Sequence, residues 1–244
     1  MDSLLFYQDP VPLDTHVHRA LRLAPVWNDY QFAAKTNSVP LAGLEFIEAA
    51  KEYTIVFTRT HEGLIVPAAL LGLREGENLF VEAAGGWGAR YIPAFVRRYP
   101  FALGAGGQEH ERPVCIDLAY SGCNAADGEA LFDDHGEPTA TLQNILHFFE
   151  DYQVHWTRTE RFVQRLQDFD LFMALTAKIE LFDGRRFALD GLLIVDEQKL
   201  LGQPDAAALS VFRAGELAWI YAHLASLTNL SRLLDRLVER EEPR

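Results

Sequence analysis

Apolar residues recur at helical spacing in the second half of the chain and predict two long helical segments. Thr139 or Thr141 can cap the start of the first segment with its hydroxyl. Thr157 and Glu160 resemble the start of a second helix, because Thr-x-x-Glu is the pattern of a capping box. We therefore expect a helical hairpin or a broken long helix here. Its apolar positions are Leu142, Ile145, Leu146, Phe149, Tyr152, Phe162, Val163, Leu166 and Phe169.

The C-terminal segment predicts a long helix, because one apolar stripe continues for about 20 residues. That stripe comprises Leu217, Ile220, Tyr221, Leu224, Leu227, Leu230, Leu234 and Leu237. The last six residues, Glu239–Arg244, are charged apart from one proline and predict a frayed, solvated end.

The first half of the chain is richer in strand patterns. Tyr53–Arg59 is dense in β-branched and aromatic residues, which favour strands. Val66–Leu73 and Leu79–Glu82 predict two more strands, joined by a hairpin loop in which Gly76 takes a positive φ. Pro113–Ala119 predicts a buried strand after an exposed polar loop at 104–112, and Pro40–Tyr53 predicts a short helix. In that helix Leu44, Ile47, Ala50 and Lys51 fall at helical spacing.

Two Asp-Gly pairs mark turns in the last third of the chain. Asp183-Gly184 lies between two strand-like runs and predicts a β-hairpin over Lys178–Leu189. Asp190-Gly191 precedes Leu192–Val195, which predicts a third strand. Strands precede helices in blocks and do not alternate strictly, so we expect an α+β fold with antiparallel sheets built from hairpins, packed helices and a long C-terminal helix.

Gly85–Phe101 is the most unusual stretch of the chain, because it combines glycines, aromatic residues and arginines. It predicts a tight glycine turn followed by a short helix with Pro93 in its first turn, ended by Pro100. Tyr91, Ile92, Phe95, Val96 and Tyr99 form the predicted apolar stripe, and Arg90, Arg97 and Arg98 lie off it.

The composition narrows the class of protein. The formal charge of −13 disfavours binding to nucleic acid or to anionic lipid surfaces. The N-terminus carries no signal-peptide pattern and no run is long enough for a membrane helix, so we expect a soluble cytoplasmic protein, with export by a signal-less route as the alternative. Two cysteines, Cys115 and Cys123, predict reduced thiols and no disulfide framework. The 244 residues predict a single domain, with a subdivision near residue 138 as the alternative.

A series of short phrases, taken in order, resembles the bacterial SapC family over almost the whole chain. One departure is Thr54, where many members carry proline. The first group comprises Val39–Leu41, Glu45-Phe46, Ala49-Ala50, Tyr53–Phe57, Pro67–Leu73, Gly76–Val81, Trp87, Arg90–Phe95 and Arg97–Phe101. The second comprises Cys115–Asp117, Leu131–Asp133, Gly136–Thr139, Asp190-Gly191, Val195–Glu197, Lys199-Leu200, Ile220–Leu224 and Ser226-Leu227.

This resemblance implies a genetic context for the protein and does not imply a particular reaction. Members resemble small soluble proteins encoded beside TonB-dependent receptors, tryptophan-halogenase-like flavoproteins and cupin-like proteins in nutrient-uptake loci. The family takes its name from a surface-layer locus. No catalytic residues are implied, and a transporter-permease label conflicts with the absence of a membrane-length segment.

The candidate ligand-binding residues are Trp87, Arg90, Tyr91, Arg97, Arg98 and Asp117. Arginines beside Gly85-Gly86 and an indole can bind an anion or stack on a planar ligand. The alternative, that these arginines pair with carboxylates of the chain, is the more common arrangement. Asp117 falls in a predicted buried strand and needs a partner, for which we propose Arg97 or Arg98.

The other polar residues are expected to have structural roles. His16 and His18 lack a recognisable third metal ligand, and Asp133, Asp134, His135 and Glu137 fit a turn better than a calcium loop, so we expect no metal site. Cys115 is expected to be a small core residue and His223 a hydrogen-bonded core histidine. No nucleophile, phosphate-loop or dinucleotide motif is present.

The residues and the resemblance leave three alternative functions. The first is a binding, accessory or regulatory protein in carbohydrate or peptide acquisition. The second is an enzyme or accessory subunit acting with a flavoprotein or cupin-like partner. The third is a surface-layer-associated protein. A homodimer through the C-terminal helix competes with intrachain packing as the reason for its apolar stripe.

Overall fold

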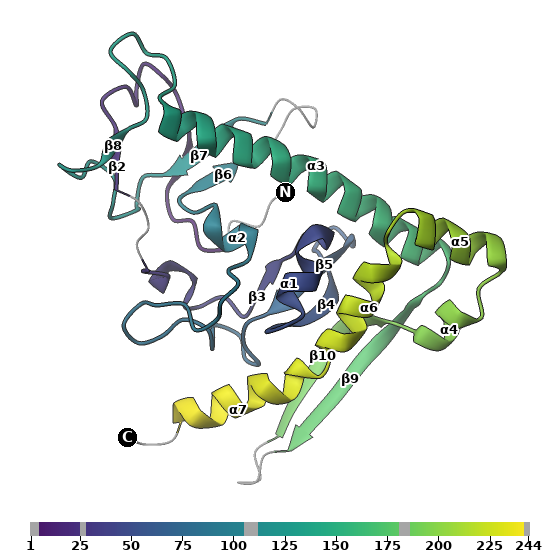
Figure 1. The fold of residues 1–244 in the computed structure, drawn as a ribbon. Helices are drawn as coiled ribbons and strands as arrows, with labels where there is room; N and C mark the ends of the chain where they lie inside the picture. Colours follow the sequence, from purple (N-terminus) through teal and green to yellow (C-terminus); the bar gives the residue numbers. More distant parts are fainter. Residues whose placement is uncertain (1–4, 25–27, 105–111, 181–185, 242–244) are drawn as a thin grey trace.

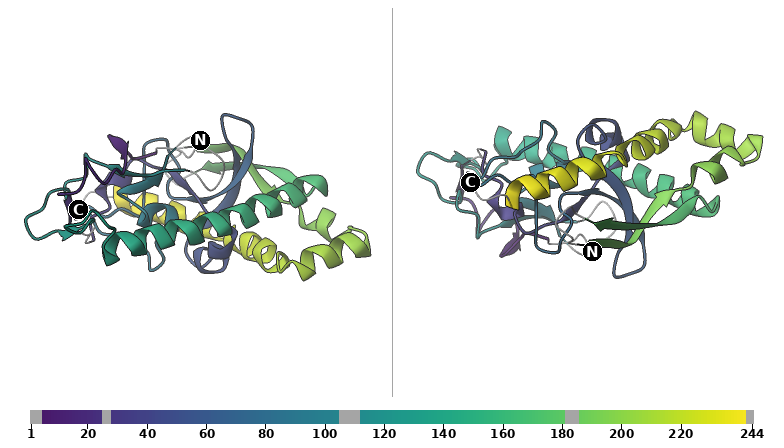
Figure 2. Two further views of the ribbon diagram at one scale, coloured as in Figure 1. Left: turned by 90° about the horizontal axis from the view of Figure 1, so that it is seen from above. Right: turned by 90° about the horizontal axis from the view of Figure 1, so that it is seen from below.

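The computed structural model describes four stretches of the chain, residues 5–24, 28–104, 112–180 and 186–241. Three antiparallel sheets and several helices make up the fold, which confirms the predicted α+β class. The molecule is elongated (Figures 1 and 2). The β2 (Arg22–Leu23) and β8 (Glu129–Ala130) end and the α4 (Glu197–Leu201) and α5 (Asp205–Arg213) end lie at opposite extremes.

The largest sheet has five strands and joins distant parts of the chain. Its order is β3-β5-β4-β10-β9, with every neighbouring pair antiparallel. β4 confirms the strand predicted at 53–59, and it pairs with β10 from the last third of the chain. The bounds are β3 Ser38–Pro40, β4 Thr54–Arg59, β5 Ile65–Leu70, β9 Phe172–Glu180 and β10 Arg186–Val195.

The β9–β10 hairpin confirms the predicted pairing around Asp183-Gly184, although that turn lies outside the described residues. The third strand predicted after Asp190-Gly191 is wrong, because β10 runs on through this pair as one strand. The register against β9 shifts between Leu189 and Leu192, and Gly191 takes φ +76°. The second Asp-Gly pair therefore forms a bulge and not a turn.

Gly191→Ala is expected to lower the free energy of unfolding by about 1 kcal/mol, because an L side chain is strained at this left-handed φ even though no atom blocks the space for a Cβ. Urea unfolding measures the change. Gly202→Ala is the matched control, since Gly202 has φ −83° and should tolerate a methyl group. Equal stability of the Gly191→Ala variant and the wild type would contradict a strained bulge.

One continuous helix, α3, crosses the molecule. It covers Ala140–Asp168, 29 residues, so the predicted break at Thr157 is wrong. Thr139 caps its start as predicted. The helix stays continuous because its apolar stripe serves two separate cores: Leu142 and Phe149 belong to the smaller one, and Phe162 and Leu166 to the larger.

The C-terminal stretch confirms the predicted helical segment, with a turn at 227–228 between α6 (Leu217–Ser226) and α7 (Asn229–Glu241). It packs against β4 and β10. Two details of the predicted apolar faces are wrong. Leu44 and Ile47 near the short helix α1 (Phe46–Ala49) are exposed, as is Tyr221 on α6, because Phe46, Ala49 and Ile220 supply the buried faces there.

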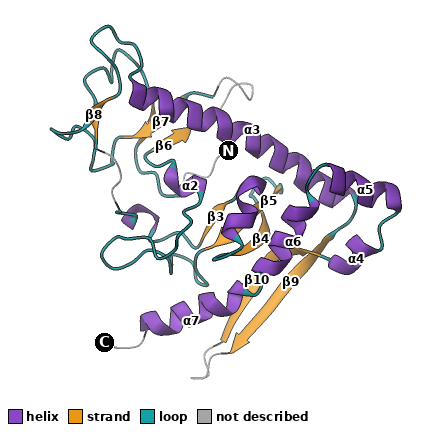
Figure 3. Cartoon of the chain, viewed as in Figure 1, coloured by secondary structure: helices purple, strands orange, loops and turns teal. Residues whose placement is uncertain are grey.

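The Gly85–Phe101 block is less helical than predicted. Only Ala94–Arg97 forms a helix, α2, and Pro93 precedes it as its N-cap (Figure 3). Pro100 ends it as expected, and Gly85 forms the predicted tight turn with φ +92°. Residues 79–82 are not a strand: they contribute a single bridge, from Val81 to Trp87, and β5 pairs instead with β3 and β4.

Short elements complete the fold. β1 (Pro10–Pro12), β6 (Phe101–Leu103) and β7 (Val114–Asp117) form a sheet in the order β1-β7-β6, and β7 confirms the predicted buried strand. The others are β2 (Arg22–Leu23), β8 (Glu129–Ala130), η1 (Gln31–Ala33), η2 (Gly43–Glu45), α4 (Glu197–Leu201) and α5 (Asp205–Arg213).

Candidate functional site

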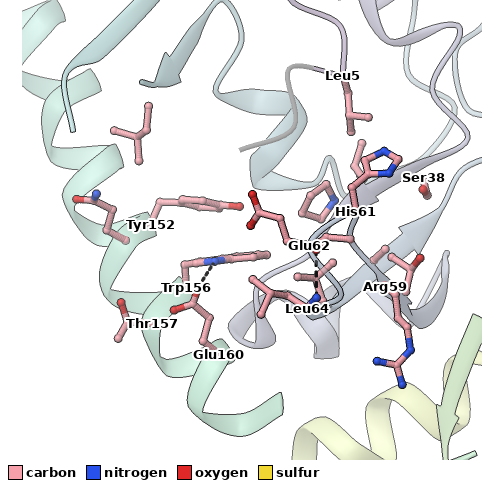
Figure 4. A pocket seen from close by; sticks show the side chains of 18 of the residues that line it. Leu5, Ser38, Arg59, His61, Glu62, Leu64, Tyr152, Trp156, Thr157 and Glu160 are labelled. Atoms are coloured by element: carbon pink, nitrogen blue, oxygen red, sulfur yellow. Dashed lines mark hydrogen bonds between the residues drawn. The ribbon is translucent and has the colours of Figure 1, made fainter. Parts of the chain in front are cut away.

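A hollow lies between α3 and the β3–β5–β4 part of the main sheet, and we call it the α3 cavity (Figure 4). Its volume is about 780 Å³. Pocket volumes of about 300–1,000 Å³ are typical of small-molecule sites. The side chains that matter for its chemistry are Tyr152, Trp156 and Glu160 from α3 and His61, Glu62 and Leu64 from the turn after β4.

Aromatic rings form the α3 side of this cavity. Tyr152 and Trp156 are four residues apart on the helix, and their near-parallel rings have centroids 6.0 Å apart. Both rings project from α3 toward the 60–64 turn (Figure 4). The indole Nε1–H of Trp156 donates to Glu160 Oε1 at 2.9 Å, which fixes the ring and places a carboxylate beside it.

The opposite side is a strand surface with a polar turn. Ser38 and Pro40 of β3 and Val66 and Ala68 of β5 line the cavity floor. The turn is closed by Thr60, whose N–H donates to the Leu64 carbonyl and whose hydroxyl accepts from the Leu64 N–H. This short turn holds the His61 and Glu62 side chains at the cavity (Figure 4).

Arg97, the last residue of α2, and Arg98, its C-cap, pack on aromatic rings. The Arg98 guanidinium lies 3.8 Å from the Phe95 ring centroid and 6.0 Å from that of Tyr152, and the residue is only 3% exposed. Arg97 lies 5.7 Å from the Phe148 ring on α3. The structure therefore places Arg98 behind the aromatic wall of the α3 cavity, where it supports Tyr152 and does not line the opening.

Tyr91 belongs to a separate buried polar cluster. Its hydroxyl donates to Glu45 Oε1 at 2.7 Å, and the Ala94 N–H donates to the same oxygen at 2.7 Å. Burial raises the pKa of the Glu45 carboxyl, although these hydrogen bonds act in the opposite direction, and burial also raises the pKa of Tyr91. The cluster joins η2 to the start of α2, so Tyr91 is held for structure.

Trp87 and Arg90 line a second hollow of about 500 Å³, which we call the arginine hollow. The Trp87 ring is buried, and its Nε1–H donates to the Tyr53 hydroxyl at 2.7 Å. The Tyr53 hydroxyl donates in turn to the Tyr91 carbonyl, and burial raises the pKa of Tyr53. The full lining comprises Glu52, Glu82, Trp87, Gly88, Ala89, Arg90, Arg232 and Arg236.

Asp117 is buried as predicted, but its predicted arginine partner is wrong. Its carboxylate accepts hydrogen bonds from the backbone N–H groups of Gln8, Asp9 and Ala119 at 2.9–3.1 Å. Among the described residues it forms no ion pair with either Arg97 or Arg98. Backbone donors just before β1 and just after β7 provide the partners that a guanidinium was expected to supply.

The remaining polar candidates have local structural roles. His18 Nδ1 accepts from the Asp14 N–H, and Asp133 accepts from the N–H groups of His135 and Glu137 in a turn. Burial raises the pKa of the Cys115 thiol, which favours its unreactive protonated form. Within the described ranges, no three His, Cys, Asp or Glu side chains converge as metal ligands would.

The six predicted residues are thus divided among five places. Trp87 and Arg90 share the arginine hollow, and Arg98 lies behind the α3 cavity. Arg97 is exposed and packs on Phe148 outside the cavity lining, and Tyr91 and Asp117 hold separate loops. The sequence analysis missed Tyr152 and Trp156 as a site, and it missed Arg232 and Arg236 altogether. Their four-residue spacing on α3 and α7 was the available signal.

One comparison with known proteins found a relationship. The family model for SapC matches residues 13–233. No curated protein and no solved structure matches the chain. In the part of the chain that the structure describes, none of the helices combines the length and apolar character that a membrane crossing requires. Since the family match covers nearly all of the sequence, the chain belongs to the SapC family.

Proposed function

We propose that this protein is a binding protein that holds a carbohydrate in the α3 cavity. The observation that carries the proposal is the pair of Tyr152 and Trp156 rings facing a polar turn across a cavity of about 780 Å³. Such a cavity has room for a ligand with several ring atoms and offers both apolar and polar contacts.

The side chains around the cavity favour a sugar ring over a simple apolar ligand. A pyranose has C–H faces that pack on aromatic rings and a rim of hydroxyls that both donate and accept hydrogen bonds. Glu62 and Glu160 are acceptors, and His61, Ser38 and Thr157 can donate or accept. An alkyl ligand has no polar atoms and could form no hydrogen bonds with these groups.

A binding role also agrees with the link to nutrient acquisition that the family resemblance implies. Among the described residues of the cavity there is no cysteine or clustered metal ligand that would favour a particular reaction. We therefore put binding before catalysis. Trp87, Arg90, Tyr91, Arg97, Arg98 and Asp117 enter this proposal only through Arg98, which supports the ring of Tyr152.

Titration of the full chain with a panel of mono- and disaccharides is expected to raise its thermal midpoint and to change its tryptophan fluorescence, a change that Trp156→Ala should reduce. Trp156→Ala should weaken binding of the best sugar at least about tenfold, because it removes the larger ring of the wall. Isothermal titration calorimetry measures the two affinities.

Val154→Ala is the matched control, because Val154 is on the same helix but 69% exposed and is not part of the cavity. It should bind sugar as the wild type does. Equal affinity of Trp156→Ala and wild type, or stabilisation by flavin or amino acids but by no sugar, would overturn the carbohydrate proposal. Turnover of the bound sugar would replace binding with catalysis.

A further inference from the structure

We propose that the arginine hollow is a second site, separate from the α3 cavity, and that it binds a small oxyanion, either a carboxylate or a phosphate group. Three guanidinium groups line it: Arg90 from the loop before α2, and Arg232 and Arg236 from α7. The chain carries a net charge of −13, so a local convergence of three cations runs against its overall composition.

These arginines keep hydrogen-bonding capacity for a ligand. Arg232 Nη1 donates to the Lys51 carbonyl at 3.0 Å, and Arg236 Nη2 donates to the Gly88 carbonyl at 2.6 Å. A guanidinium has five N–H donors, so each side chain retains others. Among the described residues, none of the three arginines forms an ion pair with a carboxylate.

The two arginines that α7 contributes are held in place before a ligand arrives. The Arg236 guanidinium lies 4.4 Å from the Phe80 ring centroid, and its bond to Gly88 fixes the loop that carries Arg90. Arg232 and Arg236 are four residues apart, so they lie on one face of α7. Fixed guanidinium groups lose little entropy when they bind an anion, which favours bidentate recognition of a carboxylate or phosphate.

Two carboxylates limit what the hollow accepts. The Glu52 carboxylate accepts hydrogen bonds from the Arg90 N–H at 2.8 Å and from the Tyr91 N–H, so its oxygens already have donors, although its negative charge remains. The Glu82 carboxylate accepts no hydrogen bond from a described residue and leaves a negative charge in the lining of the hollow, near Gly88. A small oxyanion that reaches the arginines without touching Glu82 fits this arrangement.

The test titrates the full chain with inorganic phosphate and, separately, with succinate, against chloride at equal ionic strength. We expect at least one oxyanion to raise the thermal midpoint more than chloride does, and calorimetry to give its affinity. Arg90→Ala and Arg232→Ala should each weaken that binding at least about tenfold, because each removes a charged donor. The arm that binds more tightly distinguishes phosphate from carboxylate.

Arg213→Ala is the matched control, since Arg213 is an exposed arginine on α5 outside the hollow, and it should bind the oxyanion as the wild type does. Glu82→Gln should tighten binding about two- to fivefold by removing a repelling charge. Circular dichroism checks that each variant is folded. No oxyanion effect beyond chloride, or unchanged affinity in both Arg90→Ala and Arg232→Ala, would overturn the proposal. Trp156→Ala should leave oxyanion binding unchanged. Loss of sugar binding in the α3 cavity can therefore be distinguished from loss of oxyanion binding in the arginine hollow.

Discussion

Asp117→Ala is expected to lower the free energy of unfolding by about 3 kcal/mol, because it leaves buried backbone donors without an acceptor. Asp117 is 0% exposed, and its two carboxylate oxygens serve the N–H groups of Gln8, Asp9 and Ala119. Loss of these bonds releases the segment that leads into β1 from the end of β7. Urea unfolding followed by circular dichroism measures the change.

Asp133→Ala is the matched control for this prediction. Asp133 also accepts hydrogen bonds from two backbone N–H groups, but it is exposed, so water can replace the carboxylate. Its loss should destabilise the protein much less. Similar losses of unfolding free energy in the two variants would show that burial does not increase the contribution of the Asp117 hydrogen bonds to stability.

The free energy of unfolding is also expected to fall as the pH is lowered from about 7 to 4, by about 3 kcal/mol through His223 alone. His223 is 0% exposed; its Nε2 accepts from the Val195 N–H at 3.1 Å and its Nδ1 lies 2.9 Å from the Ile55 carbonyl. The neutral ring can serve both groups. Burial lowers its pKa from the ordinary 6.5 to about 4.

The sign follows from proton binding. Below pH 6.5 the unfolded chain takes up a proton at this histidine while the folded chain does not, so protons favour unfolding until the folded pKa of about 4 is reached. His223→Leu should be less stable than the wild type at pH 7, and this difference should shrink toward pH 4.

His147→Leu provides the control, because it removes a histidine whose side chain is 75% exposed on α3. Urea unfolding of the three proteins at several pH values between 4 and 7 measures the slopes. If the difference between His223→Leu and wild type is constant over this range, the buried neutral histidine is not the source of the pH dependence.

Elements governed by neighbouring residues could be predicted from the sequence. Thr139 caps α3 and Gly85 turns the chain as expected, because capping and positive-φ turns depend on a few adjacent residues. The strand at Thr54–Arg59 and the buried strand at Val114–Asp117 follow from their apolar, β-branched composition. The number of domains stays a prediction, although strands from both halves of the chain share one sheet.

Predictions from short local sequence patterns were wrong where contacts with residues distant in the chain selected one of two possible structures. Thr157 could begin a helix, yet α3 continues through it because the helix packs on two cores. Asp190-Gly191 could turn the chain, yet β9 on one side and β4 on the other keep β10 extended through a bulge. In both cases the buried surface and hydrogen bonds gained with remote residues outweigh a short local signal.

The sequence by itself determined the family, the fold class and the unusual character of the Gly85–Phe101 stretch, because these depend on composition and on residues close together in the chain. Only the tertiary structure brought Arg232 and Arg236 of α7 to Arg90 and set Tyr152 and Trp156 opposite the 60–64 turn. The physical reason is that a binding site consists of side chains close in space, and residues about 140 positions apart become neighbours only when the packing of the whole core fixes where each helix lies.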